Sequence, residues 1–452
     1  MNTTAPKKRV VILGGGFAGA YTALHLEKRL GRRPDVEVIL VAKENFLLFT
    51  PMLHEVAGSD VAVTDIVQPL RGMLRHTRVA VAEIEAIDLG KKQVRISHSD
   101  VPHPVDLTYD HLVLALGAVT NFYHTPGLEA HALTMKTLGD AILVRNRVID
   151  ALELADNQPD ETARRTTLTV VVAGGGFAGA ETVGAVNDFL REGMKFYPHL
   201  KEKMLRVVLV HPGGVILPEL GESRGRYAQE KLARRGVEIR LKTRVTSYDG
   251  HEVALDDGSK MATRMLIWTA GISPPALLAG LPCALQRGHV VADECLRVPN
   301  WPGVWALGDC ALVPDPLKPG TFYPPTAQHA IRQAAVLASN IVAILGGKDP
   351  QPFKFKMLGS LATVGRRTGV AEILGMQFSG YVAWWLWRGI YLSKLPGLQK
   401  KVRVAIDWTL DLIFSKDIVQ LPTVRSRTMS ELEEVPLRDD PKQERMGSLI
   451  GR

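Results

Sequence analysis

The stretch VVILGGGFAGA, Val10 to Ala20, recurs almost unchanged as VVVAGGGFAGA, Val170 to Ala180. The letters GGGFAGA are identical in the two copies, and Gly14 and Gly174 stand 160 residues apart. In each copy a β-branched run precedes the glycines and an apolar stretch with helical spacing follows them. This order predicts a strand, a tight turn and a helix, twice in one chain.

The spacing Gly-x-Gly-x-x-Gly has a mechanical reason. The first glycine makes the turn, the second lets the backbone approach a pyrophosphate, and the third lets helix and strand pack closely. Free N–H groups at the helix start then face the anion. One copy alone is weak, but two near-identical copies favour two bound dinucleotides. The motif glycines are Gly14, Gly16 and Gly19, then Gly174, Gly176 and Gly179.

Composition sets broad limits. The chain has 452 residues, 46% of them hydrophobic and 23% charged, which is typical of a globular protein with about three domains. The net charge of +8 favours an anionic cofactor or membrane surface as partner. Cys283, Cys295 and Cys310 form no CxxC, so we predict no disulfide scaffold and no metal site, and a reducing compartment. No apolar run is long enough to predict a membrane span.

The ends of the second strands depart from the usual pattern. In this kind of unit an acid about twenty residues beyond the glycines binds the adenosine ribose. The first unit has Ala42, Lys43 and Glu44 at that place, so Glu44 or backbone groups could substitute. The second unit ends in His211. Since an acid favours a free ribose and an arginine a 2′-phosphate, His211 leaves NADH versus NADPH open.

Three further strands are predicted to end in small residues. They are HLVLALGA (residues 111–118), MLIWTAG (residues 265–271) and VWALGDCA (residues 304–311). The last places Gly308 and Asp309 at a strand end. This Gly-Asp is either a simple turn or a carboxylate that accepts a hydrogen bond from a cofactor hydroxyl.

Other segments carry less specific signals. FLLFTPMLHEVAG (residues 46–58) is too apolar for a surface loop, so we expect a buried connection or a wall for a flat ring. Alternating stretches at 79–87 and 93–96 predict a small β element, and the polar segment 155–167 predicts a linker or surface turn. A helix should open at Thr326, with Gln328 and Arg332 one turn apart, where a solvated polar face is the alternative to a site.

The segment Tyr381 to Phe414 holds four of the seven tryptophans, Trp384, Trp385, Trp387 and Trp408. It also carries a basic cluster without acids up to Ala405: Arg388, Lys394, Lys400, Lys401 and Arg403. Three interpretations remain open: a core helix, a dimer interface, or tryptophans and cations in a lipid headgroup layer. From about Met429 the charged composition predicts disorder.

Taken together, these features resemble the two-dinucleotide flavoprotein superfamily, and more closely a type II NADH dehydrogenase. The likeness runs from Arg9 to Gln420. Its specific marks are FLLFTPML, GGGFAGAET with Glu181, WALGDCA, PPTAQHA and FSKDIVQ at 414–420. The resemblance implies an α/β fold with two Rossmann-like, glutathione-reductase-like domains and a C-terminal amphipathic membrane-associating region.

The resemblance also implies a domain order. Residues 1–125 would begin the FAD-binding domain and 290–355 complete it, with an NAD(P)H-binding domain at 126–289 between them. A membrane-associating domain would follow at 356–422 and a disordered tail at 423–452.

By the same resemblance the first glycine motif binds FAD and the second NADH. Glu181 and Gln328 become the candidate catalytic residues, ordering the quinone site or relaying protons. The implied FAD contacts are Gly14, Gly16, Phe17, Ala18, Gly19, Lys43, Thr50, Pro51, Ala115, Gly117, Gly308, Asp309 and Ala327. The implied NADH contacts are Gly174, Gly176, Phe177, Ala178, Gly179, Glu181, His211, Ala270 and Gly271.

The expected activity is hydride transfer from NADH to flavin and then electron transfer to a membrane quinone, without proton pumping. A homodimer on the cytoplasmic face of the plasma membrane, held by an anionic lipid surface, is the expected state. A soluble diaphorase or ferredoxin reductase and a non-enzymatic flavin-binding redox sensor are the alternatives. The missing cysteines argue against a disulfide reductase or sulfide:quinone oxidoreductase, and no nucleic-acid reader motif occurs.

Overall fold

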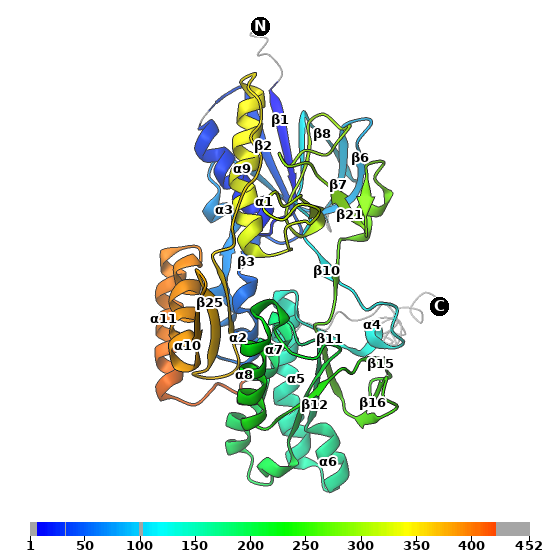
Figure 1. The fold of residues 1–452 in the computed structure, drawn as a ribbon, viewed down its shortest axis with the longest axis vertical. Coiled ribbons are helices and arrows are strands. Elements are labelled where there is room, and N and C mark those ends of the chain that lie inside the picture. Colours follow the sequence, from blue (N-terminus) through cyan, green and yellow to red (C-terminus); the bar gives the residue numbers. More distant parts are fainter. Residues whose placement is uncertain (1–6, 32, 99–102, 422–452) are drawn as a thin grey trace, which may run out of the picture. The chain divides into compact units, whose positions relative to one another are not determined.

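The computed structural model describes residues 7–31, 33–98 and 103–421, and those up to Val419 belong to one unit. Two five-stranded parallel sheets are its frame (Figure 1). In both, the strand before the glycine turn lies at the centre, which confirms two Rossmann-like domains. The first sheet has the order β22 (Val304–Ala306), β9 (His111–Leu114), β1 (Lys8–Leu13), β2 (Val36–Ala42) and β5 (Arg78–Val81). The second has β11 (Leu133–Thr134), β18 (Met265–Trp268), β12 (Thr169–Ala173), β13 (Arg206–His211) and β14 (Val237–Leu241).

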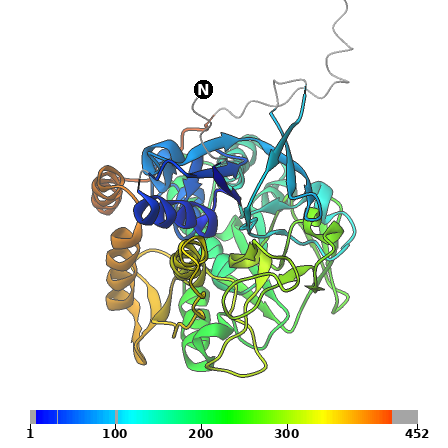
Figure 2. The ribbon, with the colours of Figure 1, turned by 90° about the horizontal axis from the view of Figure 1, so that it is seen from above.

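Helices cover the first sheet because its central strands are apolar on both faces. Val10 to Leu13 are completely buried, as expected for a parallel strand between two layers. Helix α1 (Phe17–Leu30) packs along α9 (Ala327–Leu345), and the two lie side by side in Figures 1 and 2. Strand β22 and helix α9, from late in the chain, thus complete the domain that begins at β1.

The central strand of the second sheet alternates between two cores. Val170 and Val172 face the core formed with α5 (Leu138–Asn157) and α7 (Phe177–Gly193). Val171 and Ala173 face the core formed with β15 (Val245–Tyr248), β16 (Glu252–Leu255) and β17 (Lys260–Ala262). Because side chains alternate along a strand, one short apolar run supplies both layers.

The prediction of a linker at 155–167 is wrong. Helix α5 continues to Asn157, and a second helix, α6 (Glu161–Thr167), follows after a short turn. The side chain of Asp160 accepts a hydrogen bond from the Ala163 N–H at 2.7 Å and so caps α6. The segment is polar because these helices present an exposed face, while Ala155 and Thr167 are buried.

The tryptophan segment forms two helices, α10 (Gly380–Lys394) and α11 (Leu398–Ile413), beside the antiparallel sheet β24 (Gly359–Thr363), β25 (Gly369–Ile373) and β26 (Met376–Ser379). Trp384, Trp387 and Trp408 are 3%, 0% and 5% exposed, so the headgroup interpretation is wrong for these three and the core interpretation holds. Only Trp385, 50% exposed, faces outward among the four. Spacing within the helices puts the three on the inward face.

The remaining elements are short. The small β element predicted at 79–96 is confirmed in β6 (Glu83–Asp88) and β7 (Gln93–Ser97), joined by β8 (Val105–Thr108), whereas β5 belongs to the first sheet. No helix among the described residues is long and apolar enough to cross a membrane. The others are β3 (Phe46–Leu48), β4 (Val67–Pro69), β10 (Val119–Thr120), β19 (Ile272–Ser273), β20 (Leu285–Gln286), β21 (His289–Val291), β23 (Ala311–Leu312), α2 (Leu53–Ala57), α3 (Leu70–Met73), α4 (Leu128–His131) and α8 (Glu222–Arg234).

Candidate active site

The two glycine turns end in helix N-termini that lack side-chain caps. Gly16 and Gly176 are the cap residues of α1 and α7, and neither helix carries an acid in its first turn. Helices α5, α6 and α9 differ in having a side-chain cap, and at the start of α9 Thr326 accepts from the His329 N–H. The N–H groups of α1 and α7 are therefore left for an anion, which fits the phosphates of a dinucleotide.

Each glycine of the first motif has a different steric reason. Gly14 has φ +110° and a Cβ there would collide with the Ala115 carbonyl. A Cβ at Gly19 would collide with the carbonyl of Gly14, so the third glycine allows helix and strand to touch. At Gly16, by contrast, nothing lies within 4 Å of an added Cβ. This open space above the turn is where a pyrophosphate can approach the backbone.

The second motif repeats this geometry. Gly174 has φ +111° and faces Thr269 and Ala270, which follow β18, while Gly179 packs on the Gly174 carbonyl. A Cβ at Gly176 would have one neighbour, Glu219 Oε1 at 3.9 Å. Both motifs thus leave a space at the second glycine.

The Gly-Asp turn closes one side of the first motif. Gly308 has φ +72°, and a Cβ there would lie 2.9 Å from that of Ala18 in the first turn of α1. Asp309 follows at the carboxyl end of β22, with Lys136 Nζ 3.9 Å from its carboxylate. Burial raises the pKa of Asp309, and Lys136 acts against this shift. The structure thereby brings an acid to the first glycine motif, where it can accept a hydrogen bond from a hydroxyl.

The residues that replace the ribose acids support the glycine turns. Ala42 lies under Gly15, where an added Cβ would come within 2.7 Å of the Ala42 Cβ. Lys43 is exposed and its Nζ pairs with Glu83 Oε1 at 2.8 Å. In the second unit, the Gly175 N–H donates to His211 Nδ1 at 3.0 Å.

The other predicted contact residues lie at the ends of the same elements. Thr50 and Pro51 begin a 3-10 turn after Phe49, Gly117 follows β9, and Ala327 opens α9. Phe177 and Ala178 form the first turn of α7, and Ala270 and Gly271 follow β18.

Glu181 lies in a closed ring of buried polar groups contributed by three elements. Its Oε1 accepts from the Thr363 N–H at 3.3 Å, and its Oε2 is 3.6 Å from His54 Nδ1. His54 Nε2 is 3.0 Å from Thr363 Oγ1. Burial raises the pKa of Glu181 well above its usual value, and burial together with Lys416 lowers that of His54 to about 3. Burial therefore favours the protonated, neutral form of Glu181 and the neutral form of His54, and a protonated Glu181 can donate its proton.

An aromatic series leads from the first glycine motif to this ring. Phe17, Phe49, Tyr391 and Trp387 follow one another at centroid distances of 5.8, 6.2 and 4.7 Å, and His54 lies 5.5 Å from Trp387. The stretch 46–58 is thus buried, as predicted, and it carries an apolar wall between the two sites.

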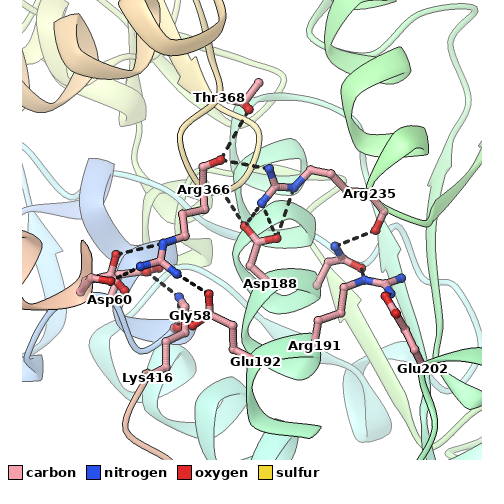
Figure 3. Close-up of polar contacts among 12 residues, drawn as sticks. Gly58, Asp60, Asp188, Arg191, Glu192, Glu202, Arg235, Arg366, Thr368 and Lys416 are labelled. Carbon is pink, nitrogen blue, oxygen red and sulfur yellow. Dashed lines mark hydrogen bonds and ion pairs between the residues drawn. The ribbon is translucent and has the colours of Figure 1, made fainter. Parts of the chain in front are cut away.

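Buried and partly buried charges join the C-terminal segment to the two Rossmann-like domains (Figure 3). Lys416 Nζ donates to the Gly58 carbonyl at 2.6 Å and pairs with Asp60. The Arg366 N–H donates to Asp188 Oδ2 at 2.6 Å, and Asp188 also pairs with Arg235. Lys416 belongs to the FSKDIVQ motif, so this motif attaches the C-terminal segment to the first domain.

A second buried acid, Glu55, accepts from Trp408 Nε1 at 2.8 Å. Arg388 lies between two tryptophan rings, 3.8 Å from the centroid of Trp384 and 4.8 Å from that of Trp408. Burial raises the pKa of Glu55 to about 8, Asp60 adds to the shift, and Arg388 opposes it.

Gln328 lies apart from the ring around Glu181. Its Nε2 donates to the Gly359 carbonyl and its Oε1 accepts from the Leu358 N–H, both at 3.2 Å. The Arg332 guanidinium stacks on Phe355, with its Cζ 4.2 Å from the ring centroid, and donates to the Gln328 backbone carbonyl at 3.3 Å, so the two side chains do not contact a common group. Gln328 thus positions the chain that enters β24.

Our reasoning from the sequence missed His54, Glu55 and Thr363. The first two are polar residues inside the apolar stretch 46–58, and that contrast was the available signal. Thr363 carries no such signal, because it is an ordinary strand residue 309 positions from His54.

Known proteins share this organisation. The family model described as pyridine nucleotide-disulphide oxidoreductase matches residues 8–334, and the NDH2 C-terminal domain matches 357–417. A type II NADH:quinone oxidoreductase of Mycobacterium tuberculosis is 32% identical over 91% of this chain and 89% of its own length. A probable mitochondrial NADH-ubiquinone oxidoreductase of Schizosaccharomyces pombe is 31% identical over 92% and 84%. The structure of NDH2 from Plasmodium falciparum in complex with NADH matches with a TM-score of 0.84 at 20% identity, covering 91% and 100%.

Proposed function

Because the chain belongs to the pyridine nucleotide-disulphide oxidoreductase family, as a type II NADH dehydrogenase, we propose that it oxidises NADH and reduces a membrane quinone through FAD. The observation that carries this proposal is the pair of open, uncapped glycine turns in one chain. Two turns of this kind fit two dinucleotides, one resident and one exchanging. The proposed reaction transfers electrons and does not pump protons.

The residues of the first motif would hold FAD and those of the second NADH. When bound, FAD supplies the two-electron chemistry between the nicotinamide and the quinone. The α1 N-terminus and Gly16 bind its diphosphate, and Asp309 accepts a hydrogen bond from a hydroxyl of the cofactor. The α7 N-terminus and Gly176 bind the diphosphate of NADH. The protein therefore contributes position and electrostatics.

The buried ring would supply a proton for quinone reduction. Glu181 Oε2 lies 3.6 Å from His54 Nδ1, and His54 Nε2 lies 3.0 Å from Thr363 Oγ1, so a protonated Glu181 faces the neutral imidazole. Burial favours this protonated form of Glu181. A quinone oxygen that gains negative charge can accept this proton.

An apolar stripe on α11 supports attachment to a membrane surface. Exposed side chains recur every three or four positions, which places them on one face of the helix. Lys394 and Arg403 are exposed nearby, whereas Lys400 is held by the Thr64 carbonyl at 2.6 Å. The stripe consists of Leu398, Val402, Ile406, Leu410 and Ile413, which are 78%, 51%, 52%, 46% and 71% exposed. Such a face can enter the interface of a bilayer.

The membrane proposal has a direct test. The triple change Val402→Gln, Ile406→Gln and Ile413→Gln should release the protein from vesicles of phosphatidylglycerol and phosphatidylcholine. Leu143→Gln with Leu154→Gln is the matched control, because these two exposed leucines lie on α5. Membrane binding that survives the triple change would overturn the proposed face.

The expected homodimer stays a prediction, which sedimentation of the purified protein checks.

The activity is tested by anaerobic stopped-flow absorption. NADH should bleach the flavin band and a soluble quinone should restore it. In Glu181→Gln the bleaching should stay, while recolouring should slow by about 100-fold, the scale of general acid catalysis. Bleaching without recolouring in the unaltered protein would favour a diaphorase, and a colourless protein would refute flavin binding.

A further inference from the structure

The second strand end has no free group for a ribose. The Gly175 N–H occupies His211 Nδ1 at 3.0 Å, which assigns the hydrogen of the neutral ring to Nε2. Nε2 faces the loop that follows the strand, since a Cβ at Gly213 would lie 2.7 Å from it. Burial lowers the pKa of His211, with a backbone hydrogen bond to Val215 acting in the opposite direction. His211 is thus a neutral support of its own loop, without a cation for a 2′-phosphate.

His211 and the loop that follows it form hydrogen bonds to both backbone groups of Gly175 in the glycine turn. Gly175 donates its N–H to His211, and its carbonyl accepts from the Leu217 N–H at 2.7 Å. Leu217 has a left-handed φ of +50°, which turns the chain directly into the 3-10 turn Pro218–Leu220. These bonds set the place of Glu219 relative to the nucleotide-binding turn.

Glu219 lies beside the start of α7 and close enough to the second strand end for its charge to act there. Its Oε1 is 3.9 Å from a Cβ added at Gly176, beside the uncapped start of α7. Its charge also acts on His211 at the strand end. Among the described residues, no hydrogen bond or ion pair engages its carboxylate, and the side chain is exposed. The ribose of a dinucleotide lies between the pyrophosphate turn and the second strand end.

We propose that Glu219 takes the part of the missing strand-end acid. Its carboxylate accepts hydrogen bonds from the adenosine ribose hydroxyls of NADH and repels the 2′-phosphate of NADPH. The inference rests on the proposed function, because it takes the second motif as the NADH site. Glu219 is a specificity-determining residue that the pattern of the strand end does not reveal, since it lies eight positions beyond His211.

A nearby cation, Lys242, would favour the opposite nucleotide preference. Lys242 borders the same loop, with its Cε 4.0 Å from a Cβ at Gly214. If Lys242 governs the ribose pocket, a 2′-phosphate will be accepted. If Glu219 governs it, the 2′-phosphate will be rejected, and the measured preference decides between the two residues.

The test is a double-mutant cycle in which one change is made in the protein and the other in the ligand. Binding of each ligand to the oxidised flavoprotein is measured by calorimetry. The ligands are NAD⁺, its 2′-deoxyadenosine analogue and NADP⁺. The unaltered protein should lose about tenfold to a hundredfold in affinity when the hydroxyl is removed, the scale of a charged hydrogen bond. Glu219→Ala should bind NAD⁺ more weakly by a similar factor and should bind NAD⁺ and the 2′-deoxyadenosine analogue with equal affinity. It should also bind NADP⁺ more tightly than the unaltered protein does. Glu222→Gln, an exposed acid paired with Arg226, is the control and should change nothing.

Steady-state kinetics add a second readout. Because the ribose is remote from the hydride, Glu219→Ala should raise the KM for NADH and leave kcat at saturation nearly unchanged. The inference is overturned if removal of the hydroxyl costs the same in both proteins, or if the unaltered protein binds NADP⁺ as tightly as NAD⁺. An unaltered protein that neither binds NAD⁺ nor bleaches with NADH refutes the proposed function instead.

Discussion

Replacing Glu55 by Gln should change how the stability of the protein depends on pH. The carboxyl group is 5% exposed and is faced by Asp60, Arg388, Lys416 and the indole of Trp408. Burial raises its pKa to about 8 from an ordinary 4.5. The folded protein therefore binds this proton at pH values where the unfolded chain has released it.

The sign and size follow from proton linkage. Between pH 4.5 and 8 the folded state holds more protons than the unfolded state, so raising the pH lowers the free energy of unfolding. Each pKa unit corresponds to about 1.4 kcal/mol, so the complete effect is about 5 kcal/mol. The stabilising effect of this proton is full below the ordinary pKa and is lost as the pH rises through about 8. Glu55→Gln carries no proton to lose and should lack this component.

Urea denaturation of the flavoprotein between pH 5 and 8.5 measures the effect. Across this range, the free energy of unfolding of the unaltered protein should fall by about 3 to 5 kcal/mol more than that of Glu55→Gln. Asp60, whose pKa burial raises to about 6, also titrates in this range and interacts with Glu55 by charge repulsion. Glu222→Gln removes an exposed carboxyl and is the control. A difference between the two proteins that stays constant with pH would refute the reasoning from burial.

Three further outcomes are expected. Gly16→Ala should fold but retain less FAD, because its Cβ meets only open space where a diphosphate would lie. Gly19→Ala should lose stability as well, because its Cβ collides with the backbone. The ratio of absorbance at the flavin and protein bands reports the loss of FAD, and the melting temperature reports the loss of stability. Lys416→Met should lower the free energy of unfolding by about 3 to 5 kcal/mol in urea denaturation, since it leaves the partly buried Asp60 without its partner. A loss below about 1 kcal/mol would match an exposed pair and contradict this reasoning. Thr326→Ala should cost about 1 kcal/mol by removing the α9 cap, which thermal unfolding would show as a small shift.

Much of the frame was predictable because it depends on local rules. The glycine spacing, the β-branched runs and the capped helix at Thr326 are short-range signals, and all are confirmed as structural elements. The segment 155–167 misled us because helix caps and polar helix faces have the same composition as a loop. The tryptophans left three interpretations open because an aromatic residue suits a core and a lipid interface equally well. The tail from 423 lies outside the described residues.

The sequence by itself determined two Rossmann-like units and the residues at their turns, since one peptide segment contains all that such a turn requires. Only the tertiary structure decided the partners of Glu181, because His54 and Thr363 come from chain segments that meet through packing of α2, α7 and β24. It also decided that Glu219 reaches the second motif, since the hydrogen bonds of a loop set that position. Periodicity in one chain tells which face of an element is buried, but the element that covers it is chosen by the fold as a whole.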